Sequence, residues 1–201
     1  MDAGLEQRIQ RLLGEQDLPA AATESIAGYG GEVLGFLVTT LRDDDAADEV
    51  FAQACEDLWR GLPGFSGKSS LRTWFYVLAR HAAARFRRSP QRRQQRRIPL
   101  SAVSEQVAGV RSLTQPYLRS DVKDAFSVIR DALDEDDRAL LVLRVDRQLD
   151  WSEVARVFSP ADAPQDELQR ASARLRKRFQ FLKKEIRERA RSAGFRADQD
   201  S

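Results

Sequence analysis

The segment SSLRTWFYVLARHAAARFRR, residues 69–88, combines apolar side chains at helical spacing with arginines that become denser toward its end. The apolar stripe consists of Leu71, Trp74, Phe75, Leu78, Ala82 and Phe86. This pattern predicts an amphipathic helix, which one of the two serines at its start can cap. Tyr76 falls on the opposite side, between Arg72 and Arg80, because residues four apart share a face of a helix. The trio predicts a surface on which an unpaired base stacks and phosphates pair.

Charge alternates in blocks along the 201-residue chain, although its net charge is only +2. Residues 61–100 carry ten basic and no acidic side chains, and residues 171–201 carry ten basic and four acidic ones. The segments that precede these two blocks are acidic. Most of the cations are arginines, which suit phosphate binding and base stacking. Two separated basic blocks indicate two contacts with a polyanion, and the alternative for each block is an ordinary solvated face.

The composition disfavours several functional classes. Hydrophobic residues make up 42% of the chain and charged residues 32%, which suits a soluble globular protein. Cys55 and His81 are the only cysteine and histidine, so we expect no internal disulfide, no metal site and no cofactor. No catalytic constellation is recognisable, and no enzymatic activity is expected. No apolar run approaches the roughly 18 residues of a membrane span, and the start of the chain lacks a signal-peptide pattern. We therefore expect a cytoplasmic protein with no membrane insertion of its own.

Helical periodicity extends over nearly the whole chain and no strand-like alternation occurs, so we expect an all-α fold. Gly and Pro in GLPGFSGK, residues 61–68, separate two helices. Asp150 and Glu153 resemble a capping box, and a long helix is expected from about Asp166. These signals predict two small helical domains joined by a flexible basic linker, the second a helix-turn-helix domain. The expected organisation is an N-terminal extension or helix over 1–24, a first domain over 25–88, the linker over 89–120, the second domain over 121–192 and a tail over 193–201.

The segment DDDAADEVFAQACEDLW, residues 43–59, resembles the polymerase-binding helix of the extracytoplasmic-function (ECF) group of bacterial sigma factors. Residues 65–88 resemble the promoter-opening segment of the same family, although His81 and Arg85 replace its usual Asn and Asp. Residues 133–158 resemble the start of its second DNA-binding domain, and 173–179 the basic end of its recognition helix. The matching positions are Asp48, Glu49, Val50, Trp59, Phe65, Arg72, Thr73, Trp74, Tyr76, Ala79, Arg80, Arg88, Leu133, Arg138, Leu143, Arg144, Leu149, Glu153, Val154 and Ala155.

The resemblance implies three contacts, with core RNA polymerase and promoter DNA as partners and an anti-sigma factor as a regulator. The polymerase-binding candidates are Asp45, Asp48, Glu49, Gln53, Glu56 and Trp59. The candidates for binding and melting the minus-ten element are Phe65, Ser66, Lys68, Ser69, Arg72, Trp74, Tyr76, Arg80, His81, Arg85 and Arg88. The candidates for the minus-thirty-five element are Gln169, Arg170, Arg174 and Lys177.

Some features leave alternatives open. The turn SPADAPQD, residues 159–166, is longer than the family's and lacks glycine, and Gln148 replaces a usual Gly. Trp74 and Phe75 can also belong to the hydrophobic core instead of contacting DNA. In the same way, His81 can be an ordinary surface or core residue, and the loop 64–70 can be a turn without a binding role. Two other functions remain: a two-domain helix-turn-helix regulator that acts without polymerase, and a sigma-like helical interaction protein that has lost promoter recognition.

Overall fold

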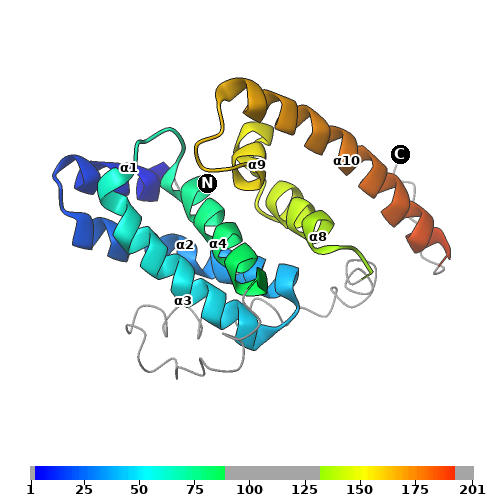
Figure 1. Cartoon of the computed structure of the whole chain (residues 1–201), viewed down its shortest axis with the longest axis horizontal. Helices are drawn as coiled ribbons and strands as arrows, with labels where there is room; N and C mark the ends of the chain where they lie inside the picture. Colours follow the sequence, from blue (N-terminus) through cyan, green and yellow to red (C-terminus); the bar gives the residue numbers. More distant parts are fainter. Residues whose placement is uncertain (1–2, 89–131, 193–201) are drawn as a thin grey trace.

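The computed structural model describes residues 3–88 and 132–192, and the regular elements of these two ranges are all helical (Figure 1). The all-α prediction is confirmed. A short 3-10 turn, Leu62–Gly64, follows the third helix, and a π-helical segment, Val142–Asp146, continues the fifth. The α-helices are α1 (Ala3–Gly14), α2 (Leu18–Leu41), α3 (Asp44–Gly61), α4 (Leu71–Arg88), α8 (Glu135–Leu141), α9 (Trp151–Phe158) and α10 (Gln165–Ser192).

Acidic side chains cap the N-termini of three of these helices. Each accepts a hydrogen bond from a backbone N–H group of the first turn that has no partner within the helix. Asp17 accepts from the Ala20 amide at 3.0 Å, and Asp43 caps α3 in the same way at 2.9 Å. Asp134 caps α8 at 2.8 Å. Each such cap stabilises its helix by about 1 kcal/mol and also places a negative charge at the positive end of the helix dipole.

The N-terminal segment is more regular than its sequence predicted. Residues 3–14 form α1, and α2 begins at Leu18, so the expected domain boundary at residue 25 lies inside a helix. The first turns of α2 bury Ala21 and Ala22, whose small side chains give little hydrophobic periodicity. The apolar stripe that was visible in the sequence therefore began only near Ile26.

Helix α1 packs closely on α2 because Gly28 has no side chain. A Cβ atom at Gly28 would lie 2.1 Å from a methyl group of Leu5, which is a severe overlap. Leu5 and Ile9 of α1 are buried against this surface. A side chain at residue 28 would therefore force the Leu5 side chain to move. The close packing of the two helices brings Glu6 of α1 to the start of α4.

The second half of the described chain consists of α8, the π-helical segment, α9 and α10. Gln148 adopts a left-handed conformation with φ of 55°, in the turn that leads to α9. The backbone amide of Asp150 donates to Glu153 at 2.8 Å, as the predicted capping box requires. Helix α10 lies across α8 and α9 on their outer side, with Leu182 buried at the contact (Figure 1).

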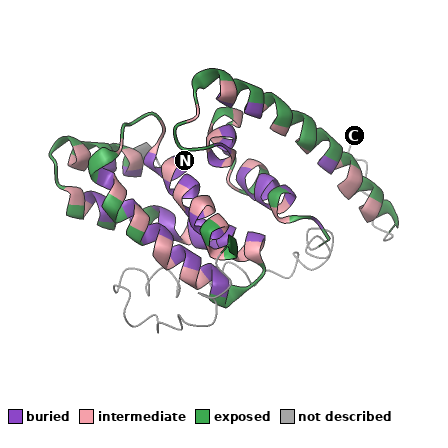
Figure 2. Ribbon diagram, in the orientation of Figure 1, coloured by how far each residue is buried: buried purple, intermediate pink, exposed green. Residues whose placement is uncertain are grey.

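The two halves pack directly on each other. Helix α4 contacts α9, and α2 contacts α8. Figure 2 shows buried residues along α4, α8 and α9. Leu140, Leu143 and Val154 of the second half belong to the same buried cluster as Phe36 and Tyr76 of the first. Within residues 3–88 and 132–192, one principal hydrophobic core therefore extends across both halves.

Three of the predicted segments lie outside the described residues: the linker 89–120, the start of the second domain at 121–131, and the tail 193–201. Within 3–88 and 132–192, no helix combines the length and the apolar character needed to cross a bilayer.

Candidate polymerase and nucleic-acid interfaces

Helix α4 carries most of the predicted minus-ten residues, and two side chains fix its first turn. Ser70, rather than Ser69, caps the helix: its hydroxyl oxygen accepts from the Thr73 amide at 3.1 Å. The Leu71 amide donates to the carboxylate of Glu6 at 2.8 Å. Sequence analysis missed Glu6, because a contact between residues so far apart in the chain leaves no local signal. Helix α1 thus helps to position the start of α4.

Tyr76 is fully buried, and the prediction that it presents an open aromatic face is wrong for this structure. Its ring meets Phe36 edge-on, with the ring centroids 5.4 Å apart, and its hydroxyl donates to Glu32 at 3.1 Å. Burial raises the pKa of the Tyr76 hydroxyl above its ordinary range, and the Glu32 carboxylate raises it further. The sequence pattern assigned one apolar stripe to α4, but helices pack on two of its sides, so the second side is buried as well.

Arg72 is also buried and is held by hydrogen bonds from both halves of the chain. Its Nε donates to Glu32 at 2.8 Å, and a terminal nitrogen donates to the backbone carbonyl of Arg147 at 3.1 Å. Because its guanidinium is satisfied inside the protein, Arg72 presents no cation to solvent in this arrangement. The predicted Arg72–Tyr76–Arg80 surface is therefore present as a cluster of neighbours, but it is covered.

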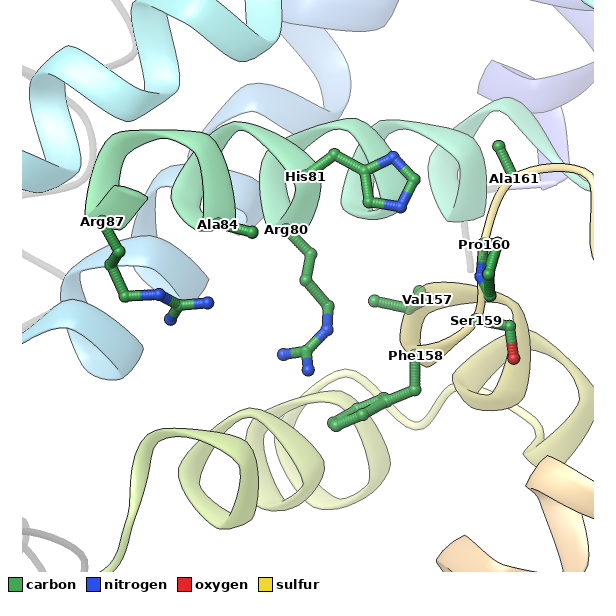
Figure 3. Close-up of a pocket in the computed structure, with 9 residues that line it drawn as sticks. All are labelled: Arg80, His81, Ala84, Arg87, Val157, Phe158, Ser159, Pro160 and Ala161. Atoms are coloured by element: carbon green, nitrogen blue, oxygen red, sulfur yellow. The ribbon is translucent and has the colours of Figure 1, made fainter. Parts of the chain in front are cut away.

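Arg80, His81 and Arg87 line a space of about 380 Å³ between α4 and the end of α9 (Figure 3). The Arg80 guanidinium lies 4.1 Å from the centre of the Phe158 ring and donates to Asp136 at 2.8 Å. Burial lowers the pKa of His81 below its ordinary value, and the nearby arginines lower it further. His81 is therefore neutral at physiological pH and adds no charge to this basic surface.

The C-terminal turn of α4 is more open. Arg85 and Arg88 are exposed. Arg85 forms an ion pair with Asp57 of α3, and the Nε of Arg88 donates to the Ala84 carbonyl at 3.2 Å. Both arginines lie in the last turn of α4. An exposed cluster of this kind suits contact with a phosphate backbone.

The loop before α4 divides into an apolar and a polar part. Phe65 packs on Trp74 with 4.9 Å between the ring centroids. A Cβ atom at Gly61 would lie 2.9 Å from the Trp74 ring, so this glycine makes room for the indole. Trp74 is therefore partly a packing residue, as its place in the apolar stripe allowed. The polar candidates beside it are Ser66 and Lys68, which are exposed, and Ser69, which is half-buried.

The polymerase-binding candidates lie together on the outer side of α3. Asp45, Glu56 and Trp59 are exposed, and the Trp59 side chain is one of the few large apolar groups at the surface of the described residues, with 52% of its area accessible. Gln53 is half-buried and donates to Glu56 at 3.1 Å. The remaining candidates, Asp48 and Glu49, are also half-buried. An acidic helix face with an exposed tryptophan suits binding to a basic protein surface that has an apolar pocket.

The four minus-thirty-five candidates share the exposed side of α10. Gln169, Arg170, Arg174 and Lys177 are all accessible to solvent, and Arg170 forms an ion pair with Asp166 one turn earlier. Two other basic residues of α10 are engaged within the protein: Arg178 donates to Asp137 of α8 at 2.7 Å, and Lys183 lies over the Phe179 ring at 5.3 Å. The position of the apolar stripe therefore identified the exposed side of α10, but it did not predict the contacts of Arg178 and Lys183 within the protein.

Comparison with known proteins agrees with this geometry. Residues 26–94 match the family model of sigma-70 region 2. Over 200 aligned residues, the chain is 26% identical to an RNA polymerase sigma-H factor of Pseudomonas aeruginosa, an alignment that covers 92% of this chain and 96% of the relative. The matched region holds α3 and α4, the helices with the acidic and basic candidate surfaces. Residues 26–94 are therefore similar to region 2 of the sigma-70 family, and this region of the chain is built around α2, α3 and α4.

Proposed function

We propose that the protein is an ECF-type sigma factor that binds core RNA polymerase through α3, binds and opens the minus-ten element through α4 and its preceding loop, and reads the minus-thirty-five element through α10. The observation that carries this proposal is the pairing of two opposite surfaces on adjacent helices of region 2. The outer face of α3 is acidic and includes exposed Trp59, whereas the end of α4 is basic. Such a domain can bind a protein and DNA at the same time.

The acidic face of α3 is suited to a protein rather than to DNA, because phosphates would repel Asp45 and Glu56. Trp59 stands at the end of the same face, and tryptophan is the side chain most enriched among residues that dominate binding energy at protein interfaces. Complementary charge would guide the encounter, and the buried indole would supply most of the affinity. Core polymerase is the partner that a sigma-70 region 2 requires.

The DNA contacts divide between two helices. Arg85 and Arg88 of α4 would meet phosphates, and Ser66, Lys68 and Ser69 are the polar groups that could hold a base outside the duplex. On α10, the exposed side carries Gln169, Arg170, Arg174 and Lys177. Arg and Gln form bidentate contacts with guanine and adenine in the major groove. The proposal places the protein in the bacterial cytoplasm, with an anti-sigma factor as a further partner.

The polymerase contact can be tested with matched charge reversals. Asp45→Lys/Glu56→Lys should weaken binding to core polymerase at least about tenfold, or about 1.4 kcal/mol, because two attractive contacts become repulsive. Glu15→Lys/Glu188→Lys makes the same change of net charge at two exposed residues, one in the turn after α1 and one in α10, and should leave the affinity unchanged. Titration of labelled protein with core enzyme measures both, and circular dichroism checks the helices. Equal affinities for the two variants would contradict the assignment of α3.

The length of the turn between α9 and α10, residues 159–164, favours a second candidate function for the C-terminal half. In this alternative, α10 binds DNA without reading bases, and promoter choice lies in α4 and its loop.

A different alternative for the whole protein is a DNA-binding regulator that acts alone. Such a regulator would shift promoter DNA without core enzyme, whereas the proposed sigma factor needs the polymerase. An electrophoretic shift with and without core enzyme separates these functions.

A further inference from the structure

We infer that Glu6 is a positioning residue for the loop 66–69, to which the proposed function assigns base capture, and that helix α1 is therefore part of the site that opens the promoter. The inference rests on the proposed function and extends it from α3, α4 and α10 to the N-terminal helix. Glu6 acts through the backbone of Leu71, the first residue of α4, and not through a DNA contact of its own. The contacts of this carboxylate carry the argument.

The loop before α4 is held at both of its ends and is open in the middle. Before the loop, Phe65 packs on Trp74 with 4.9 Å between the ring centroids. After the loop, the Leu71 amide donates to the Glu6 carboxylate at 2.8 Å. Residues 66–68 between these two contacts are exposed. A segment whose two ends are held has less conformational freedom to lose, so the capture of a base costs less free energy.

The Glu6 carboxylate is itself held by side chains of α1 and α2. Its Oε1 accepts from the Leu71 amide and also from Gln10 at 3.0 Å, and its Oε2 accepts from the Tyr29 hydroxyl at 2.9 Å. Burial raises the pKa of the Tyr29 hydroxyl above its ordinary range, and the hydrogen bond to Glu6 raises it further, so this hydroxyl stays a donor at physiological pH. A carboxylate with three donors offers the Leu71 amide an acceptor at one defined position.

Two consecutive residues in the first turn of α4 are held by carboxylates of two other helices. Glu6 of α1 accepts from the Leu71 backbone, and Glu32 of α2 accepts from the Arg72 side chain at 2.8 Å. The first amides of a helix have no partner within it, and this end of the helix dipole favours a negative charge. Glu6 therefore satisfies an amide that the helix leaves free, and in doing so it fixes the end of the loop to α1.

The contact of Glu6 is independent of the second half of the chain. The later turns of α4 are joined to that half by the ion pairs Arg80–Asp136 and Arg87–Glu135. The acceptor and donor of the Glu6 contact, in contrast, both lie within residues 3–88. Removal of the Glu6 side chain leaves the two ion pairs in place, so its effect on the loop can be measured separately.

The contact can be measured without DNA, because hydrogen exchange followed by NMR reads the Leu71 amide directly. Glu6→Ala removes the acceptor and should speed this exchange at least about tenfold, as expected for a hydrogen bond to a charged group. Glu15→Ala removes an exposed carboxylate from the turn after α1 and should keep the wild-type rate. Glu6→Gln retains a carbonyl acceptor and should keep most of the protection. An unchanged rate in Glu6→Ala would overturn the inference.

A second measurement tests whether this contact serves base capture. Holoenzyme formed with each variant selects from promoter DNA that is partly single-stranded and randomised across the minus-ten element, and the bound strands are sequenced. The wild-type and Glu15→Ala proteins should enrich one base at the captured position about tenfold or more. Glu6→Ala should lower this enrichment at least about threefold, because a loop that is free at one end holds the wrong bases nearly as well. A merely structural role would reduce the yield of bound DNA equally for all bases.

The outcomes distinguish the inference from the proposed function. If the wild-type protein enriches no base, the loop captures none, and the minus-ten part of the proposed function fails together with the inference. If Glu6→Ala enriches the same base as strongly as the wild-type protein, the proposed function stands and the inference fails. Tyr29→Phe removes one donor to Glu6 but keeps the buried ring. It should change both readouts in the same direction by a smaller factor, and it replaces Glu6→Ala if that variant does not fold.

Discussion

The carboxylate of Glu32 accepts hydrogen bonds from both Arg72 and Tyr76, and so joins the two residues that looked most suited to exposed DNA contacts. The two donors are buried, whereas 35% of the Glu32 side chain remains accessible to solvent. Tyr76 therefore stabilises the packing of α2 on α4. The aromatic ring has a structural role here that the residue type alone did not reveal.

The hydroxyl of Tyr76 gives a direct test of this role. Tyr76→Phe keeps the ring but removes the donor to Glu32, so it should lower the free energy of unfolding by about 1.5–3 kcal/mol, as for hydrogen bonds to charged groups. Urea denaturation followed by circular dichroism measures the change. An exposed stacking residue would tolerate the same substitution, and so an unchanged midpoint would contradict the buried arrangement.

Gln148 adopts the backbone conformation that favours glycine, with φ of 55°. A non-glycine residue there is strained by about 1–2 kcal/mol, and glycine loses about 0.5–1 kcal/mol through its greater freedom in the unfolded chain. Gln148→Gly should therefore leave stability unchanged or raise it by up to about 1 kcal/mol. Gln148→Ala serves as the control, since it removes the side chain but keeps the strain. Thermal unfolding of both variants decides the matter, and a clear loss for glycine would show that the Gln148 side chain itself is needed.

At the scale of helices, periodicity predicted most of the elements but not which of their faces are covered. The apolar residues of α3, α4 and α10 recur at helical spacing, and these helices lie where expected. Residues 1–24 were predicted only as an extension or helix, because the buried residues of α1 and of the first turns of α2 are few or small. The packing of α9 on α4 and of α8 on α2 could not be foreseen, because no local pattern encodes where these helices lie in space.

The exposed face of α10 allows its proposed role to be tested against simple phosphate binding. With core enzyme present, Arg170→Ala and Arg174→Ala should each cost about 1–3 kcal/mol at particular base pairs of a promoter library, as the loss of a bidentate base contact does. Lys184→Ala, at another exposed residue of α10, should weaken binding evenly across the library. Affinity selection followed by sequencing measures both. If all three variants act evenly, α10 anchors the protein without reading bases.

For the molecule as a whole, one shared core makes the two halves thermodynamically dependent. Leu140 and Leu143 are buried in the same cluster as Phe36 and Phe75, so neither half can unfold without exposing part of the other. We expect a single cooperative transition in calorimetry, with equal calorimetric and van't Hoff enthalpies. Glu135→Lys/Asp136→Lys should broaden or split this transition. Two transitions in the unmodified protein would indicate that the halves are independent.

The ion pairs Arg80–Asp136 and Arg87–Glu135 also give the ions of the cytoplasm two opposed effects on this protein. Dissolved salt screens the pairs and so frees the arginines of α4. It also weakens their attraction to DNA, because the release of condensed counterions gains less entropy when the solution already holds more salt. The affinity of the free protein for DNA should then fall less steeply with ionic strength than its phosphate contacts alone would dictate. A cell that accumulates potassium under osmotic stress would thus free more of these arginines from their carboxylates while making each phosphate contact weaker.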